Sequence, residues 1–380
     1  MKIAIARQKT SKKWRTVEMS WEQFLGKLRD PHRTAETMRE YKAMSKADRD
    51  AAKEAAGGFV GGALNSGQRK TENVTERSLI TLDADNAKAR AWQRVTVLHD
   101  FRMACYSTHS HTEEQPRIRW VVPTDRPMTP DEYPAVARRV AEWLDIETMD
   151  PTTYEVARLM YWPTVSKDGS YEYHEQDGDL LCVDEVLQSY GYGEAWRDAT
   201  LWPIAKCEQE IRVREQKKAG DPTEKQGIIG LFCRTYSVYD VIEQFLSDVY
   251  TETANPDRFT YEGGTTAGGA IVYDDGKFLY SNHATDPVNG EGSVNAFDLV
   301  RIHMFGAQDG DAGSETNITK LPSYKAMSQW ASELPDVKSQ MVEERAAAME
   351  SEFGDLLGAD ESEEEQTDAN AWKHQLELNN

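Results

Sequence analysis

The stretch RSLITLDADNAKAR, residues 77–90, guides the interpretation of the whole chain. Residues 79–82 are mostly β-favouring, which predicts a strand that ends at Asp83. Side chains two residues apart on a strand point the same way, about 6.6–6.8 Å apart along the chain, so Asp83 and Asp85 present carboxylates on one face. Such a pair suits hard divalent cations, which bind carboxylate and triphosphate oxygens together. A turn or a helix cap after the strand is the simpler interpretation of the same two residues.

Polar side chains in two downstream segments add to this pair. ACYSTHSHTEEQPRIRWVVP, residues 104–123, predicts two strands, with donors after the first and two arginines on one face of the second. MDPTTYEVARLMYWPTVSKDG, residues 149–169, supplies a third carboxylate and two more cations. Cationic and hydrogen-bonding groups of this kind stabilise developing charge on phosphates. The residues concerned are Ser107, His109, His111, Arg117, Arg119, Asp150, Arg158 and Lys167.

Each of these residues also has a purely structural explanation. The histidines could lie in a surface loop, and the arginines could form cross-strand ion pairs with nearby acids. Asp150 precedes a proline, which is a common way to start a helix.

The combination resembles the archaeo-eukaryotic primase superfamily, in particular phage and plasmid primase-polymerases and the N-terminal part of virulence-associated protein E. In that superfamily a DxD or DxE motif, an sxH motif and a later acidic residue form the site. The segments LDAD, STH and MDPTT look like these three motifs in order. The resemblance implies a nucleotidyltransferase of a phage or other mobile element. Asp83, Asp85 and Asp150 would be its catalytic residues and the metal ligands for two Mg²⁺ or Mn²⁺ ions.

The resemblance also implies the binding partners: nucleoside triphosphates, a single-stranded DNA template and a separate replicative helicase. His109, His111 and Arg119 compete for the role of the motif histidine. Contacts with the incoming nucleotide are expected from Ser107, His109, His111, Arg117, Arg119, Arg158 and Lys167. Contacts with nucleic acid are expected from Arg69, Lys70, Lys12 and Lys13.

The order of predicted elements indicates an α+β fold. A primase-like catalytic domain is expected over residues 1–195, as an RRM-like sheet with a flanking α/β unit. A charged helix and linker follow at 196–226, then a smaller α+β domain at 227–340. The acidic segment 341–380 is expected to be disordered.

A glycine-rich segment, GGFVGGALNSGQRK, precedes the decisive strand. It comes close to a phosphate-binding loop of the GxxxxGK[ST] type. However, Gln68 and Arg69 replace the lysine and the hydroxyl that this mechanism needs. The segment is therefore predicted to be an ordinary loop.

The charge is unevenly distributed along the chain. The formal net charge is −21, and residues 350–370 hold nine acids and no base. Residues 1–15, in contrast, carry six bases and no acid. Exposed charges are screened beyond about 8–10 Å at physiological salt, so the basic N-terminus can still contact phosphate.

The composition argues against a membrane or secreted protein. No apolar run approaches the roughly 20 residues of a membrane helix. The N-terminus is too polar for a signal peptide. The cysteines are scattered without CxxC spacing, which argues against a zinc site and fits the reducing cytoplasm of a bacterial host cell.

Two alternative functions come from other classes. A non-catalytic replication adaptor or DNA-mimicking interaction protein could keep the primase fold and use the acidic tail. A metal-dependent nuclease or a rolling-circle nickase could be built around HSH and a tyrosine such as Tyr154. However, Ser110 stands where that motif needs a bulky apolar residue.

Overall fold

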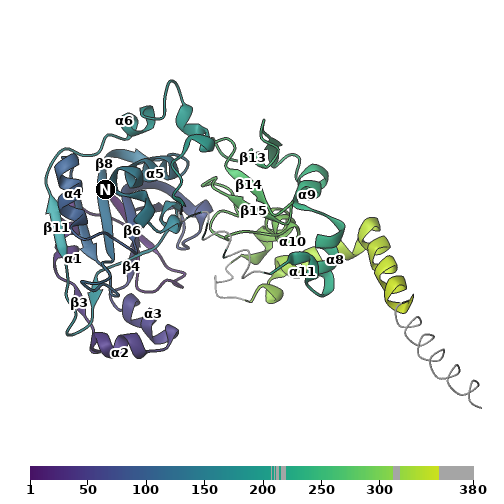
Figure 1. The fold of residues 1–380 in the computed structure, drawn as a ribbon, viewed down its shortest axis with the longest axis horizontal. Helices are drawn as coiled ribbons and strands as arrows, with labels where there is room; N and C mark the ends of the chain where they lie inside the picture. Colours follow the sequence, from purple (N-terminus) through teal and green to yellow (C-terminus); the bar gives the residue numbers. More distant parts are fainter. Residues whose placement is uncertain (207, 209, 211–213, 215–219, 311–316, 351–380) are drawn as a thin grey trace, which may run out of the picture.

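The computed structural model describes residues 1–206, 208, 210, 214, 220–310 and 317–350. The α+β fold class is confirmed, because antiparallel sheets and helices alternate along the chain. An N-terminal part, purple to teal in Figure 1, contains the LDAD segment, and a smaller green part follows it.

The central sheet of the N-terminal part consists of antiparallel strands built around β6 (Val74–Ala84). This long strand is the one predicted from residues 79–83, extended at its start. It pairs along most of its length with β8 (Ile118–Met128). In spatial order the strands are β11 (Tyr173–Gln176), β7 (Met103–Ser107), β8, β6 and β5 (Gly62–Leu64).

Alternating side chains of β6 bury two different cores. Ile80 and Leu82 pack toward α5 (Glu132–Leu144), and Leu79 packs toward the opposite face. All three side chains are fully buried, and each contributes roughly 1.5–3 kcal/mol to the stability of the fold. The two-residue period therefore fixes the direction of each β6 side chain, including those at its carboxyl end.

A second antiparallel sheet and α1 (Trp21–Arg29) cover the Leu79 face. The helix begins at a capping box formed by Ser20 and Gln23. The strands of the second sheet, in spatial order, are β2 (Arg15–Glu18), β1 (Lys2–Ala6), β4 (Gly58–Val60) and β9 (Met160–Tyr161).

The prediction of a loop over the glycine-rich segment is wrong for its first part. That part forms β4 and β5, one strand in each sheet. A Cβ at Gly62 would lie 2.0 Å from the Glu76 carbonyl oxygen, and one at Gly58 would lie 2.9 Å from that of Met160. Glycine is used here because the neighbouring backbones approach too closely for a side chain.

A short helical pair, α2 (Met38–Ala43) and α3 (Lys46–Glu54), lies at the bottom of Figure 1. Both helices start at hydroxyl caps, Thr37 and Ser45. The parallel two-stranded pairing of β3 (His32–Arg33) with β10 (Thr164–Val165) connects this region to the segment after Asp150.

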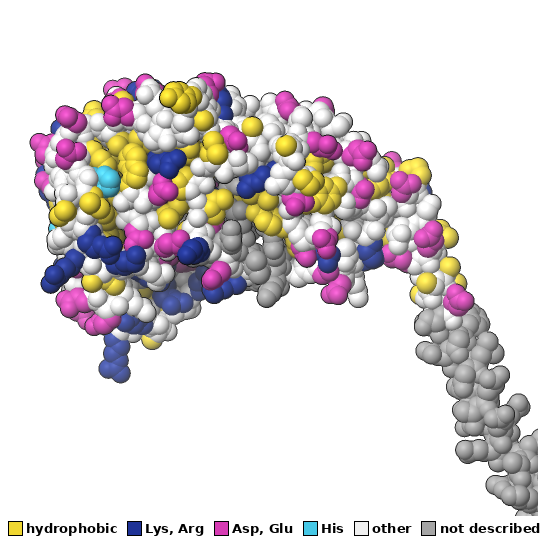
Figure 2. Space-filling view, turned by 45° about the horizontal axis from the view of Figure 1, so that its top comes forward, with side chains coloured by type: hydrophobic (Ala, Val, Ile, Leu, Met, Phe, Trp, Pro, Cys, Tyr) yellow, Lys and Arg dark blue, Asp and Glu magenta, His cyan; other side chains and the backbone are white. Residues whose placement is uncertain are grey.

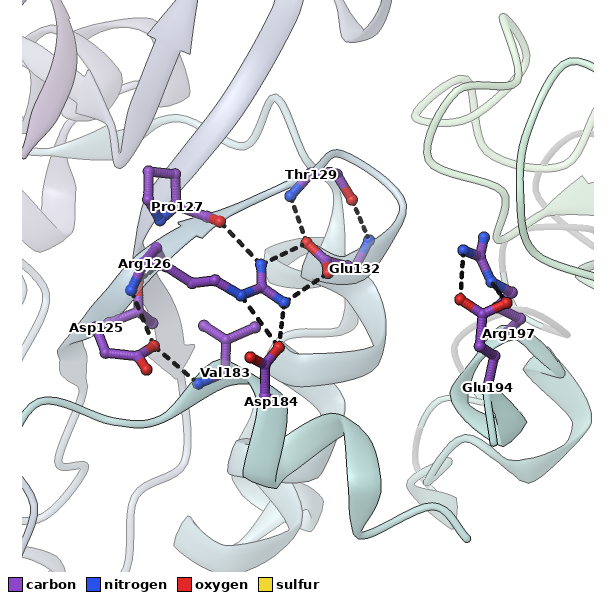
Figure 3. A network of polar contacts seen from close by, with 10 residues as sticks. Asp125, Arg126, Pro127, Thr129, Glu132, Val183, Asp184, Glu194 and Arg197 are labelled. Carbon is purple, nitrogen blue, oxygen red and sulfur yellow. Dashed lines mark hydrogen bonds and ion pairs between the residues drawn. The ribbon is translucent and has the colours of Figure 1, made fainter. Parts of the chain in front are cut away.

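Ion pairs attach helices to the end of β8 (Figure 3). Arg126 pairs with Glu132 at 2.8 Å and with Asp184 at 2.6 Å. Asp125 accepts a hydrogen bond from the Val183 amide at 3.0 Å. These contacts join β8 to the start of α5 and to α6 (Val183–Gln188), while α4 (Ala91–Leu98) follows the LDAD turn.

The C-terminal part is a four-stranded antiparallel sheet with helices. A hairpin places Tyr273 opposite Phe278 across the Asp-Gly turn. A helix follows the Asn295 cap and continues from Arg301 as a π-helix. The elements of the C-terminal part are α8 (Gly227–Thr235), α9 (Val238–Phe245), β12 (Tyr250–Glu252), β13 (Arg258–Tyr261), β14 (Ala270–Tyr273), β15 (Phe278–Ser281), α10 (Ala296–Val300) and α11 (Pro322–Glu333).

Helical structure continues past the predicted domain end. Residues 335–350 form a helix, so the expectation of disorder is wrong for residues 341–350. Residues 351–380, and part of the charged segment 196–226, lie outside the described residues. Among the helices that the structure describes, none has the length and apolar character needed to cross a membrane.

Candidate active site

Three acidic residues meet at the end of β6. Asp83 belongs to the strand, and Asp85 lies in the turn that follows it. The Asp150 amide donates a hydrogen bond of 2.8 Å to the Asp83 carbonyl oxygen, next to a β-bridge between Ala84 and Met149. Burial raises the pKa of Asp85, and the negative charges of Asp83 and Asp150 raise it further. The fold thus brings Asp150, distant in sequence, beside the LDAD pair.

Each of these carboxylates is paired with an arginine. Asp83 contacts Arg119 at 2.6 Å and Asp85 contacts Arg117 at 2.9 Å. The sheet register explains both pairs, because Asp83 lies directly opposite Arg119 on β8, and Arg117 follows on the same face. Asp150 contacts Arg158 at 3.1 Å from the segment that leads to β9.

Arg119 is the most buried of these arginines. It also donates to the Tyr161 carbonyl oxygen at 2.9 Å and to the Tyr106 hydroxyl at 3.2 Å. Burial disfavours its charge, but the Asp83 carboxylate and Tyr106 outweigh this effect and raise the pKa of Arg119. Oδ1 of Asp83 is buried and has no hydrogen-bond partner in the described part of the chain.

A cavity of about 180 Å³ opens beside Asp83 and Asp85. It is lined by Lys53, Asp83, Asp85, Tyr106, Thr108, His109, Ser110, Arg117, Arg119, Tyr161, Trp162, Pro163 and Thr164. The cavity is not lined by the predicted site residues Ser107, His111, Asp150, Arg158 and Lys167, although Asp150 adjoins Asp83 through its backbone.

Some lining residues were not predicted as site residues. Lys53 reaches the cavity from α3, Tyr106 from β7 and Thr164 from β10. No motif surrounds Lys53, so its sequence context gives no signal. Tyr106 directly precedes the STH segment, and its position on a strand could have placed it beside Arg119.

The two histidines occupy different environments. His109 lines the cavity, with Nδ1 2.9 Å from the Thr164 hydroxyl and Nε2 3.1 Å from Glu36. Burial lowers the pKa of His109, so the ring is neutral near pH 7. His111 accepts a hydrogen bond from the Arg117 amide at 3.1 Å and supports the strand instead. Ser107 also has a structural partner, because its hydroxyl accepts from the Glu172 amide at 2.9 Å.

The residues expected to contact nucleic acid differ in their surroundings. Arg69 donates to the Ala157 carbonyl oxygen at 3.0 Å and lies over the Trp14 ring. Lys70 donates to the Gly310 carbonyl oxygen at 3.0 Å in the C-terminal part. Lys12 and Lys13 are exposed, and Lys13 lines a second, more open groove. Nucleic-acid contact by these residues stays a prediction.

The chemistry of the cavity suits a divalent cation. No group of three or more His, Cys, Asp or Glu side chains among the described residues is arranged to hold a metal ion. Asp83 and Asp85 nevertheless offer hard oxygen donors, and one of them is the unpartnered Oδ1 of Asp83. A cation here would offset the repulsion that raises the pKa of Asp85. Asp83 and Asp85 therefore fit such an ion.

Comparisons with known proteins identify the family. None of the curated proteins matches the chain. A solved structure, the AEP domain of the cyanophage S-2L primase-polymerase, matches at 17% identity and a TM-score of 0.29, and covers 43% of this chain and 93% of that one. The model of the VapE N-terminal domain family matches residues 1–205, which is more than half of the 380 residues. The chain therefore belongs to the VapE N-terminal domain family, which confirms the resemblance predicted from its LDAD, STH and MDPTT segments.

Proposed function

We propose that this protein is a primase-polymerase-type nucleotidyltransferase that joins nucleotides on a single-stranded DNA template. Nucleoside triphosphates would be the substrates and Mg²⁺ or Mn²⁺ the cofactor. One observation carries the proposal: acidic and basic side chains from separate segments meet at one cavity. Asp83 and Asp85 line it, Asp150 adjoins them, and Arg117, Arg119 and Lys53 supply positive charge.

In this reaction a hydroxyl oxygen forms a bond to the α-phosphorus, and the bond to the leaving pyrophosphate breaks. Asp83 and Asp85 would hold the divalent cation through their carboxylate oxygens. When bound, such a cation lowers the pKa of a nearby hydroxyl and neutralises triphosphate charge. A separate helicase remains a predicted partner of the same process.

Arg117 and Arg119 have a role that follows from their ion pairs. Guanidinium groups bind phosphate oxygens as readily as carboxylates, through two parallel N–H donors. When a cation compensates Asp83 and Asp85, Arg117 and Arg119 can turn toward the triphosphate. Preorganised donors of this kind stabilise charge that develops in the transition state.

His109 and Lys53 complete the cavity wall. Among the candidates for the motif histidine, we assign the role to His109, because it lines the cavity and its ring is held on both nitrogens. Its neutral ring adds no charge, and its single N–H faces the Glu36 carboxylate, so His109 would shape the cavity wall. Lys53 pairs only loosely with Asp50, at 3.7 Å, so its ammonium group can approach a phosphate.

The test is incorporation of labelled nucleotides on single-stranded DNA with Mg²⁺ or Mn²⁺. The double variant Asp83→Asn/Asp85→Asn should reduce nucleotide incorporation by at least about 100-fold. Removing even an outer-shell partner of a metal ion can cost that much activity. Asp100→Asn is the matched control, because it removes an exposed carboxylate that does not line the cavity. Equal incorporation by the wild type and the double variant would show that this site is not catalytic.

A non-catalytic adaptor is the second candidate, and the arginine pairs favour it. Each carboxylate of the cluster already has a guanidinium partner, so its charge is compensated without a metal ion. An adaptor would bind nucleic acid or a replication protein but would incorporate no nucleotide with either metal. The incorporation experiment therefore separates the two functions.

A further inference from the structure

A second groove adjoins the carboxylate cavity and shares Trp162 and Pro163 with it. Its volume is about 570 Å³, and it is wide and open to solvent. The charged and titratable residues that line it are Arg7, Lys13, Arg15, Lys27, Asp30 and His32. The lining thus combines four permanent positive charges with one carboxylate.

The four cations come from the N-terminal strands and the first helix. Arg7 and Lys13 lie in the connection between β1 and β2, Arg15 begins β2, and Lys27 lies on α1. Nζ of Lys27 is 5.2 Å from the ring centre of Trp162, which is the wall shared with the carboxylate cavity. The four cations of the second groove therefore extend to the entrance of the candidate active site.

These cations differ from the arginines of the cavity in having no acidic partner. Arg117 and Arg119 are each ion-paired. Within the described ranges, neither Arg7, Lys13, Arg15 nor Lys27 forms an ion pair. Figure 2 shows dark-blue side chains on the lower part of the N-terminal part, with magenta side chains among them. Exposed charges without internal partners are available to an external anion.

We propose that this groove binds the phosphate backbone of a single-stranded nucleic acid and leads it past Trp162 toward the carboxylate cavity. This inference rests on the proposed function, because a template strand must reach the reacting nucleotide. An open, positively charged groove is complementary to a chain of regularly spaced phosphates. The net charge of −21 does not prevent this contact, because screening limits exposed charges to about 8–10 Å.

The salt dependence of nucleic-acid binding measures how many phosphates the groove contacts. Each phosphate neutralised on a single strand contributes about −0.7 to the slope of log K against log salt concentration. Four cations in the groove predict a contribution of about −2.8 to that slope. Replacing three of them should make the slope less steep by about 2.

The experiment measures fluorescence anisotropy of a labelled oligothymidylate with the full chain at several salt concentrations. The variant Arg7→Ala/Arg15→Ala/Lys27→Ala should bind more weakly and show the smaller slope. The control Lys320→Ala/Lys325→Ala/Lys338→Ala makes the same change in net charge with exposed lysines of the C-terminal part. Because the groove residues are exposed as well, both variants should melt at the wild-type temperature.

The outcomes separate this inference from the proposed function. If the groove variant and the control show the same affinity and slope, the groove proposal is wrong, even when wild-type protein incorporates nucleotides. If wild-type protein incorporates nothing but the groove variant loses oligonucleotide affinity, the groove proposal stands and the catalytic one fails. Asp83→Asn/Asp85→Asn should keep the wild-type salt slope, since neither carboxylate lines the groove.

Discussion

Asp85 experiences opposing electrostatic effects at the mouth of the cavity. Burial and the charges of Asp83 and Asp150 raise its pKa, while the Arg117 guanidinium lowers it. A protonated carboxyl is a poor ligand for a cation, so Asp85 must lose its proton before the cavity can hold a metal ion. The lowest pH at which the cavity still binds a metal ion should therefore lie above the usual pKa of an aspartate.

Removing the Arg117 charge should shift this limit. In Arg117→Ala, Asp85 loses the larger of the two arginine charges that lower its pKa, so the midpoint of metal-dependent nucleotide binding should move to higher pH. The measurement is nucleotide affinity at fixed metal concentration across a pH series, with Lys320→Ala as the control. A midpoint that stays in place or moves to lower pH would contradict the assignment to Asp85.

Arg119 should matter more for stability than the other arginines. Its side chain is only 6% exposed, and Arg119→Ala would leave the Asp83 carboxylate, itself 19% exposed, without its partner. Breaking a buried pair from one side costs about 3–5 kcal/mol in the free energy of unfolding. Urea denaturation monitored by fluorescence measures this change.

The control for Arg119 is Arg29→Ala. Arg29 also pairs with acids, but its side chain and that of Glu175 are about 40% exposed. Exposed pairs contribute little, so the free energy of unfolding should hardly change. Similar losses in the two variants would mean that the Asp83–Arg119 contact is not a buried pair in solution.

At the scale of elements, the register between β6 and β8 builds the site. A shift of one residue would turn Asp83 away from the cavity and place Leu82 in its position. The hydrophobic faces on both sides of the central sheet oppose such a shift, because Ile80 and Leu79 are buried in different cores. Packing and the arrangement of the candidate site thus depend on the same alternation.

The close contact between β5 and β6 predicts a sharp effect of a single methyl group. In Gly62→Ala the new Cβ would lie 2.0 Å from the Glu76 carbonyl oxygen and 2.9 Å from Cα of Arg77. Overpacking of this kind costs about 1–3 kcal/mol in the free energy of unfolding. Thermal melting should show a lower midpoint.

Gly26→Ala is the matched control for Gly62→Ala. Gly26 lies inside α1, and no atom lies within 4 Å of the position that a methyl group would occupy there, so the substitution meets no steric obstacle. Alanine in a helix interior is more stable than glycine by about 0.5–1 kcal/mol, and the melting midpoint should rise. A Gly62→Ala variant that melts like wild type would disprove the tight β5–β6 contact.

Much of this arrangement could be predicted from local sequence patterns. Strand alternation in the sequence predicts that Asp83 and Asp85 share one face, and that Arg117 and Arg119 share one face. The pairing of Asp83 with Arg119 depends on the register between the two strands. Hydrophobic alternation alone does not determine this register, because a shift by two residues leaves every side chain on the same face. The strands at Gly58 and Gly62 were missed because glycine has low strand propensity, and only the neighbouring backbones explain its presence.

The cavity wall was harder to predict than its carboxylates. Lys53 and Thr164 approach the site only because α3 and β10 pack together, which no spacing in the sequence encodes. The assignment of catalytic roles to Asp83, Asp85 and Asp150 stays a prediction.

At the scale of the whole molecule, the two parts of the chain are joined by polar contacts. Asp131 accepts hydrogen bonds of 2.8 Å from the amide and the hydroxyl of Thr265. Arg138 on α5 makes a buried bidentate pair with Glu208 and also contacts Asn282 at 3.2 Å. The C-terminal part is therefore attached to α5, the helix that packs against the central sheet.

Loss of the Asp131 contacts should reduce this coupling. Asp131→Ala would leave the Thr265 amide and hydroxyl without their acceptor, which costs about 1–3 kcal/mol. Differential scanning calorimetry should then resolve separate transitions for the two parts. Asp248→Ala, an exposed carboxylate of the C-terminal part, is the control and should keep the wild-type profile. An unchanged profile for Asp131→Ala would show that these contacts do not couple the parts.

Asp83 and Asp85 are proposed to hold a divalent cation together with a triphosphate in the cavity that they help to line. Isothermal titration calorimetry of a nucleoside triphosphate, with and without Mg²⁺, tests it most directly. Wild-type protein should release binding heat that depends on the metal, and Asp83→Asn/Asp85→Asn should release none. Metal-independent heat of equal size in both proteins would contradict the claim.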